Sequence, residues 1–204
     1  GNSVVAITNS GSTSNQIRYN TITADNLTVG TSMLEITGTS STVYSNIIDA
    51  GNIFARAVNL TTAASSNISN NNIQRATTNL IHVSDSSSFS VIIQYNYLHD
   101  SAGTAVQLIN AATVNVSYNI FNNVTNGIQL TAASTDSNRF QGNNFYNISG
   151  QAIELGTDGP TANDLNDVDT GANGLQNYPV LTSATVTGNT IQITGTLNTT
   201  NGSY

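Results

Sequence analysis

The chain has 204 residues, of which 38% are hydrophobic and only 7% charged, and its net charge is −7. It is long enough for one substantial domain with an apolar core. Its basic residues are four arginines, too few for the basic stripe that a nucleic-acid binder needs. Because cysteine is absent, disulfides and thiolate metal sites are excluded. No apolar stretch is long enough for a membrane span, so we expect no membrane insertion.

A short phrase recurs from residue 17 to residue 145, in the form that reads VSYNIF at residues 116–121. In each copy, a hydrophobic residue stands three positions before an asparagine and another stands two positions after it. The spacing of these asparagines is 23 to 26 residues, and they are Asn20, Asn46, Asn71, Asn96, Asn119 and Asn143. A repeat of this length indicates a solenoid, whose units bury their apolar faces against their neighbours.

A second phrase runs in step with the first and reads hydrophobic, polar, hydrophobic. This alternation is typical of a strand with one buried face. Its polar members form the predicted outward column, which is Glu35, Asn59, His82, Gln107, Gln129 and Glu154. Each unit has room for about three short strands and no helix. We therefore expect an all-β fold, a parallel β-helix of about six to seven coils over residues 1–155.

The recurring asparagine has a predicted structural role. Asn tolerates the left-handed backbone region better than most residues, so we expect it to make the bend between two strands. Stacked once per coil, the side chains would bond to one another as an amide ladder.

These repeats and the asparagine ladder resemble the right-handed parallel β-helix repeat family, the pectate-lyase-like superfamily, of the kind found in large bacterial surface and secreted proteins. The resemblance covers roughly residues 1–183. It implies the fold but leaves the function open, because lyases, hydrolases, epimerases and non-enzymatic surface proteins share this architecture.

The resemblance implies that the outward column, from Glu35 to Glu154, is the face for a carbohydrate ligand. Its two carboxylates stand five coils apart, or roughly 24 Å at the spacing of β-strands. Glycoside hydrolysis needs two carboxylates within about 5–10 Å, which this column does not supply. A second candidate is His99 with Asp100, near Asp49 two coils away, where the histidine could act as a general base. The alternative is a solvated turn.

An acidic segment, residues 156–183, breaks the repeat and contains both prolines of the chain. Its oxygen-bearing side chains suit a structural Ca²⁺ ion, and the candidate ligands are Asp158, Asp164, Asn166, Asp167 and Asp169. The alternative is a solvated acidic loop. In both cases we expect the segment to cap the end of the β-helix, with Leu175, Tyr178, Val180 and Leu181 as an apolar lid.

Residues 184–204 predict a β-hairpin, because alternating apolar residues flank Gly188-Asn189. A lone hairpin is marginal in water. It would pack on the β-helix, pair with another chain, or begin a truncated β-sandwich module.

Two functions remain open. The first is a non-enzymatic structural or adhesive module, secreted or at the cell surface, that assembles with itself or with neighbouring domains of a larger chain and needs no cofactor beyond structural Ca²⁺. The second is a carbohydrate-binding or polysaccharide-cleaving protein, a lyase or glycoside hydrolase, that holds a surface glycan on the outward column.

Overall fold

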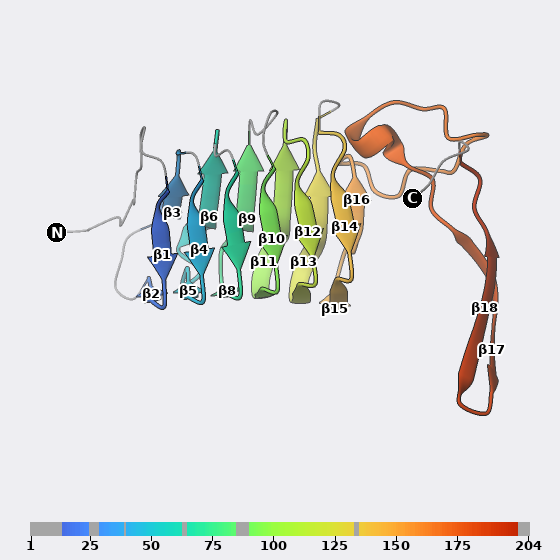
Figure 1. Ribbon diagram of the computed structural model, residues 1–204, viewed down its shortest axis with the longest axis horizontal. Coiled ribbons are helices and arrows are strands. Elements are labelled where there is room, and N and C mark those ends of the chain that lie inside the picture. The colour runs from blue at the N-terminus through green and yellow to red at the C-terminus, as the bar shows by residue number, and fades with distance from the viewer. Residues whose placement is uncertain are drawn as a thin grey trace.

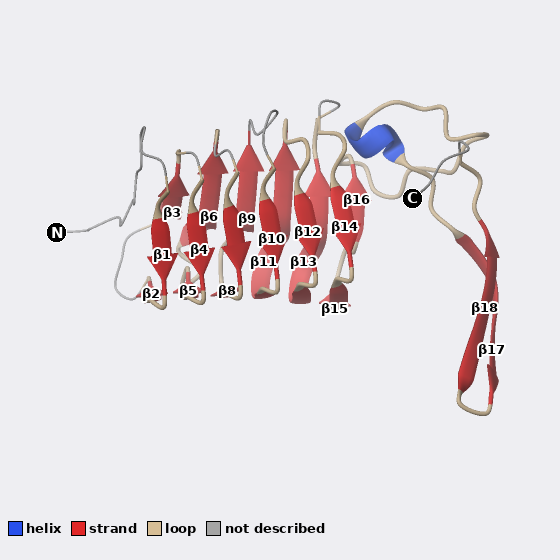
Figure 2. Ribbon diagram, viewed as in Figure 1, coloured by secondary structure: helices blue, strands red, loops and turns tan. Residues whose placement is uncertain are grey.

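The computed structural model describes residues 14–24, 29–38, 40–62, 65–84, 90–132 and 135–199. Its strands form a parallel β-helix, followed by a loop and an antiparallel hairpin (Figure 1 and Figure 2). The expected all-β solenoid is confirmed. Among the described residues, no helix is long and apolar enough to cross a membrane.

The β-helix has three rows of strands, each with six rungs in register. The first row is β1 (Gln16–Arg18), β4 (Thr42–Tyr44), β7 (Asn67–Ser69), β10 (Ile92–Gln94), β12 (Asn115–Ser117) and β14 (Arg139–Gln141). The second row begins with β2 (Thr21–Thr23), β5 (Ile47–Asp49) and β8 (Asn72–Gln74), and ends with β15 (Asn144–Ile148). The third row begins with β3 (Gly30–Ile36), β6 (Phe54–Thr61) and β9 (Asn79–Ser84), and ends with β16 (Ile153–Leu155). Two long strands, β11 (Tyr97–Ile109) and β13 (Ile120–Leu130), contribute to both the second and third rows.

The core fills the space between the three rows. Its side chains are the hydrophobic members of both sequence phrases, and those of the middle coils are fully buried, such as Ile68, Ile73 and Ile81. At the last coil, Phe140 and Phe145 are only partly buried, although the Phe145 ring stacks on that of Phe121 with centroids 4.7 Å apart. The C-terminal end of the core is therefore incompletely covered.

The asparagine ladder lies at the turn between the first and second rows. Asn71 donates from Nδ2 to Oδ1 of Asn96 at 2.9 Å, and Asn96 donates to Oδ1 of Asn119 at 3.0 Å. The same Oδ1 atoms accept from the backbone N–H of the preceding ladder residue, at 3.0 Å for Asn71 and 2.9 Å for Asn96. From Asn46 onward, Nδ2 also donates to a carbonyl of the preceding coil, as Asn96 does to Ile68 at 2.9 Å. Ladder residues in the middle of the rod are thus buried with their amides bonded on both sides, as predicted.

The predicted backbone role of these asparagines is wrong. The left-handed residue of the turn is the one before each ladder residue, with φ between 53° and 64°: Tyr19, Ser45, Asn70, Tyr95, Tyr118 and Gly142. The physical reason is that the ladder residue must point both its backbone N–H and its side chain along the rod. The bend therefore falls on its neighbour, where the side chain points to solvent.

The C-terminal segment first covers one corner of the last coil and then leaves the rod. A short 3₁₀ turn, η1 (Ala172–Leu175), places Asn173 beside Asn138, and the two exchange bonds of 2.8 and 3.2 Å. The chain then forms the hairpin of β17 (Val180–Thr187) and β18 (Thr190–Thr196), which projects away from the rod (Figure 1). The predicted hairpin is present and begins four residues earlier than expected.

The ladder makes a quantitative prediction. Asn96→Ala removes the acceptor for two donors of Asn71 and the donor to Ile68, all buried. Because each unsatisfied buried group costs about 1–3 kcal/mol, we expect a loss of about 3–5 kcal/mol in the free energy of unfolding, measured by urea titration. Asn20→Ala, at the exposed end of the ladder, is the matched control and should lose about 1 kcal/mol. Equal losses at both positions would contradict this role of the ladder.

Candidate functional site

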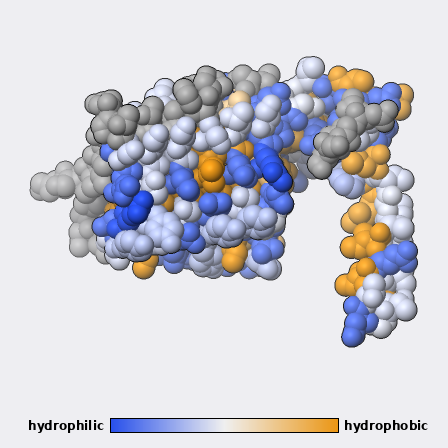
Figure 3. Space-filling view, viewed as in Figure 1, coloured by the Kyte–Doolittle hydropathy of each residue, from blue (hydrophilic) through white to orange (hydrophobic). Residues whose placement is uncertain are grey.

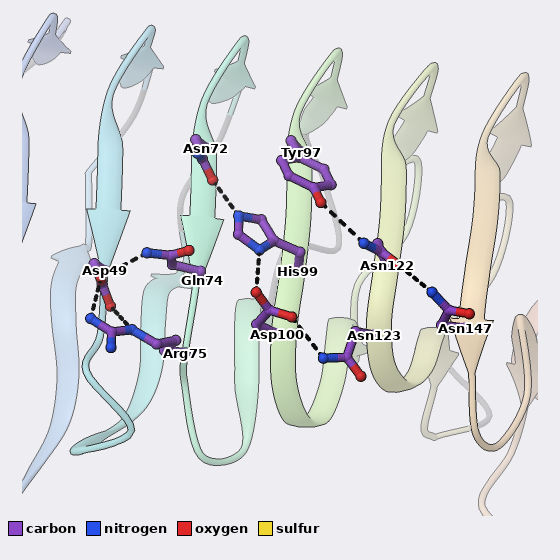
Figure 4. Close-up of polar contacts among 10 residues, drawn as sticks. All are labelled: Asp49, Asn72, Gln74, Arg75, Tyr97, His99, Asp100, Asn122, Asn123 and Asn147. Carbon is purple, nitrogen blue, oxygen red and sulfur yellow. Dashed lines mark hydrogen bonds and ion pairs between the residues drawn. The ribbon is translucent and has the colours of Figure 1, made fainter.

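Successive coils bring a polar cluster together on the second row (Figure 4). The parallel register places Asp49 opposite Gln74, and Gln74 opposite His99, in β5, β8 and β11. The next turn is made by left-handed residues, with φ of 60° at Arg75 and 54° at Asp100. As predicted from the sequence, Asp49 thus lies on the same face as His99, two coils away.

Asp49 is held by the neighbouring coil. Both of its oxygens accept bonds from Arg75, and Gln74 donates to Oδ2 at 2.7 Å. The backbone N–H of Gly51 donates to Oδ1 at 3.0 Å. Burial raises the pKa of the Asp49 carboxyl, but the bonds from Arg75, Gly51 and Gln74 together outweigh it and the pKa is lowered. Asp49 is therefore a fixed carboxylate in a structural ion pair.

His99 is buried, and both of its ring nitrogens have oxygen partners. Nδ1 lies 2.9 Å from Oδ2 of Asp100, and Nε2 lies 2.6 Å from Oδ1 of Asn72. Its ring stacks on that of Tyr97, with centroids 4.0 Å apart. A general base needs a free lone pair within reach of the substrate. In this arrangement a ring nitrogen of His99 gains a free lone pair only if its bond to Asp100 or to Asn72 breaks.

Amide side chains extend the cluster along the rod. Asn123 donates to Oδ1 of Asp100 at 2.7 Å, and this bond, with that to His99, lowers the pKa of the Asp100 carboxyl. Asn147 donates to Asn122 at 2.9 Å, and Asn122 donates to the hydroxyl of Tyr97 at 3.1 Å (Figure 4). A shallow depression of about 440 Å³ lies beside Arg75 and Asp100. Sequence reasoning missed these partners, although the register places Asn72 opposite Tyr97 and Asn122 opposite His99.

The predicted outward column forms on the third row. Its six residues are in register from Glu35 to Glu154. Adjacent members bond to each other: Asn59 donates to Glu35 at 2.7 Å and lies 2.6 Å from Nδ1 of His82. Gln129 donates to Glu154 at 2.8 Å and lies 3.5 Å from the amide nitrogen of Gln107.

The column is less open than a ligand face requires. Asn59, His82 and Glu154 are buried, with exposed fractions of 6%, 4% and 7%. Glu35, Gln107 and Gln129 are half-buried. The alternation in the sequence correctly predicts the direction of these side chains, but it does not predict how closely their neighbours cover them.

Three of the five candidate metal ligands come together in the loop. Carboxylate oxygens of Asp164, Asp167 and Asp169 lie within 4.8 Å of one another. Two of these residues bond within the loop, since Asp167 accepts from the backbone N–H of Asn177 at 2.8 Å and Asp164 from that of Val168 at 3.1 Å. Asp158 lies outside the trio, against Gly156, and Asn166 is exposed. The Ca²⁺ site stays a prediction.

A cavity of about 1100 Å³ lies between the last coil and the loop. Its walls include Phe140 and Leu155 of the rod and Leu175, Tyr178 and Pro179 of the loop. Leu175 and Tyr178 thus lie on the loop side of this cavity, and the lid stays a prediction for these two residues. Val180 and Leu181, also expected in the lid, are instead exposed on β17.

The geometry defines a β-helical rod with bonded polar columns on its outer faces, and the comparison with protein families agrees. The family model described as "Right handed beta helix region" matches residues 1–145. The chain therefore belongs to the right-handed β-helix family. Neither the comparison with curated proteins nor that with solved structures found a match.

The ion pair of Asp49 predicts a pH dependence. Because its folded pKa is lowered, the ionised carboxylate stabilises the fold above the ordinary Asp pKa, and this contribution is lost as pH falls through the folded value. Arg75 is 42% exposed, so Arg75→Gln should cost at most about 1 kcal/mol at pH 7. The difference from the wild type should shrink in urea titrations below about pH 4.

Arg18→Gln is the matched control for this prediction, since Arg18 is exposed on β1. It should leave the stability unchanged at every pH. A difference between Arg75→Gln and the wild type that persists undiminished at low pH would contradict the role assigned to Asp49.

The acidic trio predicts a second, opposite pH effect. Burial, then the charges of Asp164 and Asp167, raise the pKa of Asp169. Its contribution to stability is therefore present at low pH and is lost as pH rises through the raised value. With chelator at pH 7, Asp169→Asn should slow amide exchange in residues 163–178, and this gain should vanish on acidification.

Adding Ca²⁺ then tests the metal prediction. A bound ion would slow exchange in the wild-type loop and much less in Asp169→Asn, while Asp158→Asn, outside the trio, should behave as the wild type. If Ca²⁺ leaves wild-type exchange unchanged, the predicted calcium site is wrong.

Proposed function

We propose that the chain is a non-enzymatic structural or adhesive module, secreted or at the cell surface, in which the β-helix acts as a rigid rod. One observation carries this proposal. Among the described residues, the polar side chains of the outer faces bond along the rod to the next coil, and they do not converge on a common point in front of it.

The carboxylates of the outer faces illustrate this arrangement. Glu35 accepts from Asn59, and Asp49 accepts from Arg75. Glu154 accepts from Gln129 at 2.8 Å and from the N–H of Gly159 at 3.1 Å. Hydrolysis of a glycoside needs an acid and a second carboxylate on opposite sides of one bond. Carboxylates already engaged in bonds between coils support a structural use.

The ladder supports the rigid character of the proposed rod. A continuous series of amide bonds joins all six rungs, and every strand is bonded in register to its neighbour. Bending the rod would stretch these bonds on one side. The low charge and amide-rich surface support an extracellular location, as a property of composition.

Glycan binding is the alternative function. It is favoured by the half-buried amides of Gln107 and Gln129, which lie next to each other in the column. It is opposed by the burial of Asn59, His82 and Glu154 in the same column. A ligand there would contact only part of the face.

Binding and turnover assays separate these functions. Under the proposal, the protein turns over neither acidic nor neutral polysaccharides, and small-angle scattering shows an elongated particle. Turnover that His99→Ala or Asp100→Asn abolishes would overturn it.

Glycan-array binding lost at least tenfold in Gln107→Ala/Gln129→Ala would favour the alternative function. Gln94→Ala, on the first row, is the matched control, and it should bind as the wild type does.

A further inference from the structure

The C-terminal hairpin has one apolar face, outside the irregularity at Thr182. Residues directly opposite in an antiparallel pair project to the same side, and alternate residues share that side. Ala184 faces Ile193, and Val186 faces Ile191, while Leu181 joins them through its pairing with Gly195. The opposite face is almost entirely polar, and its residues are Val180, Ser183, Thr185, Thr187, Thr190, Gln192, Thr194 and Thr196.

This apolar face is open to solvent. Leu181, Val186, Ile191 and Ile193 have exposed fractions of 68%, 69%, 64% and 60%, and every residue of both strands is exposed. The side chains form a continuous hydrophobic stripe along the projecting hairpin (Figure 3). Their exposed area is on the order of 450 Å², within the range of the largest patches on monomers, which are often functional. An isolated two-stranded hairpin is marginal in water, so this face needs a partner.

The base of the hairpin is bonded to the loop. Asn177, just before β17, donates to the carbonyl of Asn198 at 2.7 Å and to that of Asp164 at 2.9 Å. Asn198 in turn accepts from the N–H of Asn166 at 3.1 Å. Asn177 is buried, so these bonds are shielded from water. These bonds join both ends of the hairpin to the loop, while its apolar side chains remain exposed.

A second copy of the hairpin matches this face. Residues 180–199 contain no charged side chain, although the chain has a net charge of −7. Two hairpins can therefore meet without bringing like charges together. Face to face, they form a four-stranded sandwich about 10 Å thick, with the polar faces in water. The contact uses the same surface on both copies, so it closes on itself as a two-fold dimer.

The buried area sets the strength of this contact. Two faces together bury on the order of 900 Å², just below the smallest specific interfaces, which bury about 1,000–1,200 Å². The dimer should therefore be weak, and its population should depend on protein concentration.

We propose that the apolar face of β17–β18 is a homodimerisation surface that joins two rods at their C-terminal ends. This inference deepens the proposed structural function, on which it rests, by adding a joint to the rod.

Light scattering coupled to size exclusion, over a range of concentrations, tests the proposal. The mass should rise from the 21.3 kDa of one chain toward twice that value. Ile191→Thr/Ile193→Thr keeps the β propensity and removes the apolar face, so it should weaken dimerisation at least tenfold. Thr190→Ser/Gln192→Thr, on the polar face, is the matched control and should dimerise as the wild type does. Circular dichroism verifies that each variant retains the rod.

Cysteine cross-linking gives a second readout, and it does not require a polar substitution in the apolar face. The chain has no cysteine, so a single one reports alone. Under mild oxidation Val186→Cys should form a covalent dimer, and Thr185→Cys, on the polar face, should form at least tenfold less.

Three results would overturn the proposal. One is a monomer at every concentration. Slow amide exchange in β18 of this monomer would show that the hairpin packs on its own rod. Fast exchange would indicate that the apolar face binds a different β-sheet partner. Another is a dimer that the Ile191 and Ile193 changes do not affect. The third is growth beyond dimers, which would indicate pairing through strand edges. None of these results bears on the rod shape or on the lack of turnover, so the proposed function is tested separately.

Discussion

The ladder of amides, buried in the four inner coils, is the constraint on which the rest of the structure depends. Each inner ladder asparagine accepts two bonds from the coil before it and donates to the coil after it, as Asn96 does between Asn71 and Asn119. Replacing one of these asparagines would leave buried donors and acceptors without partners, which costs more free energy than the bonds themselves contribute. The ladder therefore fixes the register of neighbouring coils. Once the register is fixed, every other position of the repeat must also stack on its counterpart.

This stacking explains why the described outer faces bear columns of bonded side chains, with a shallow depression beside Arg75 and Asp100. Chemically similar side chains meet their counterparts about 4.8 Å away, and amides and carboxylates at that spacing bond to one another. The Glu35–Asn59–His82 series arises in this way, whereas the Asn147–Asn122–Tyr97 series joins neighbouring coils diagonally. Catalysis requires unlike groups that converge on one substrate bond. A solenoid with short turns and this register favours surfaces whose polar side chains bond to one another. This is the physical basis of the structural proposal.

The sequence predicts the periodic part of the molecule because the length of each repeat determines which residues of neighbouring coils pair. Spacings of 23–26 residues place Asn119 above Asn96 and Gln129 above Gln107, and the structure agrees. The left-handed residue was misplaced because propensity points to Asn, whereas the ladder bonds move the bend to residues such as Tyr95. The partner of His99 was missed because Asn72 reaches it diagonally, and such contacts depend on side-chain direction. The loop contacts of Asn177 have no repeat to reveal them, and only the three-dimensional path brings Asp164 and Asn198 together.

At the C-terminal end, where the repeat stops, the stacking no longer determines the structure. A seventh coil would bury Phe140 and Leu155, but the chain substitutes a loop that covers one corner and leaves a cavity beside them. The loop also bonds to the hairpin base, where buried Asn177 donates to the carbonyl of Asn198. The hairpin is thereby held in a defined orientation without disturbing the rod, and its apolar stripe is displayed instead of being used as a lid. A lid would have to seat its apolar side chains on the last coil. Those of Leu181, Val186, Ile191 and Ile193 are instead 60% to 69% exposed, which leaves them available for the homodimer proposed above.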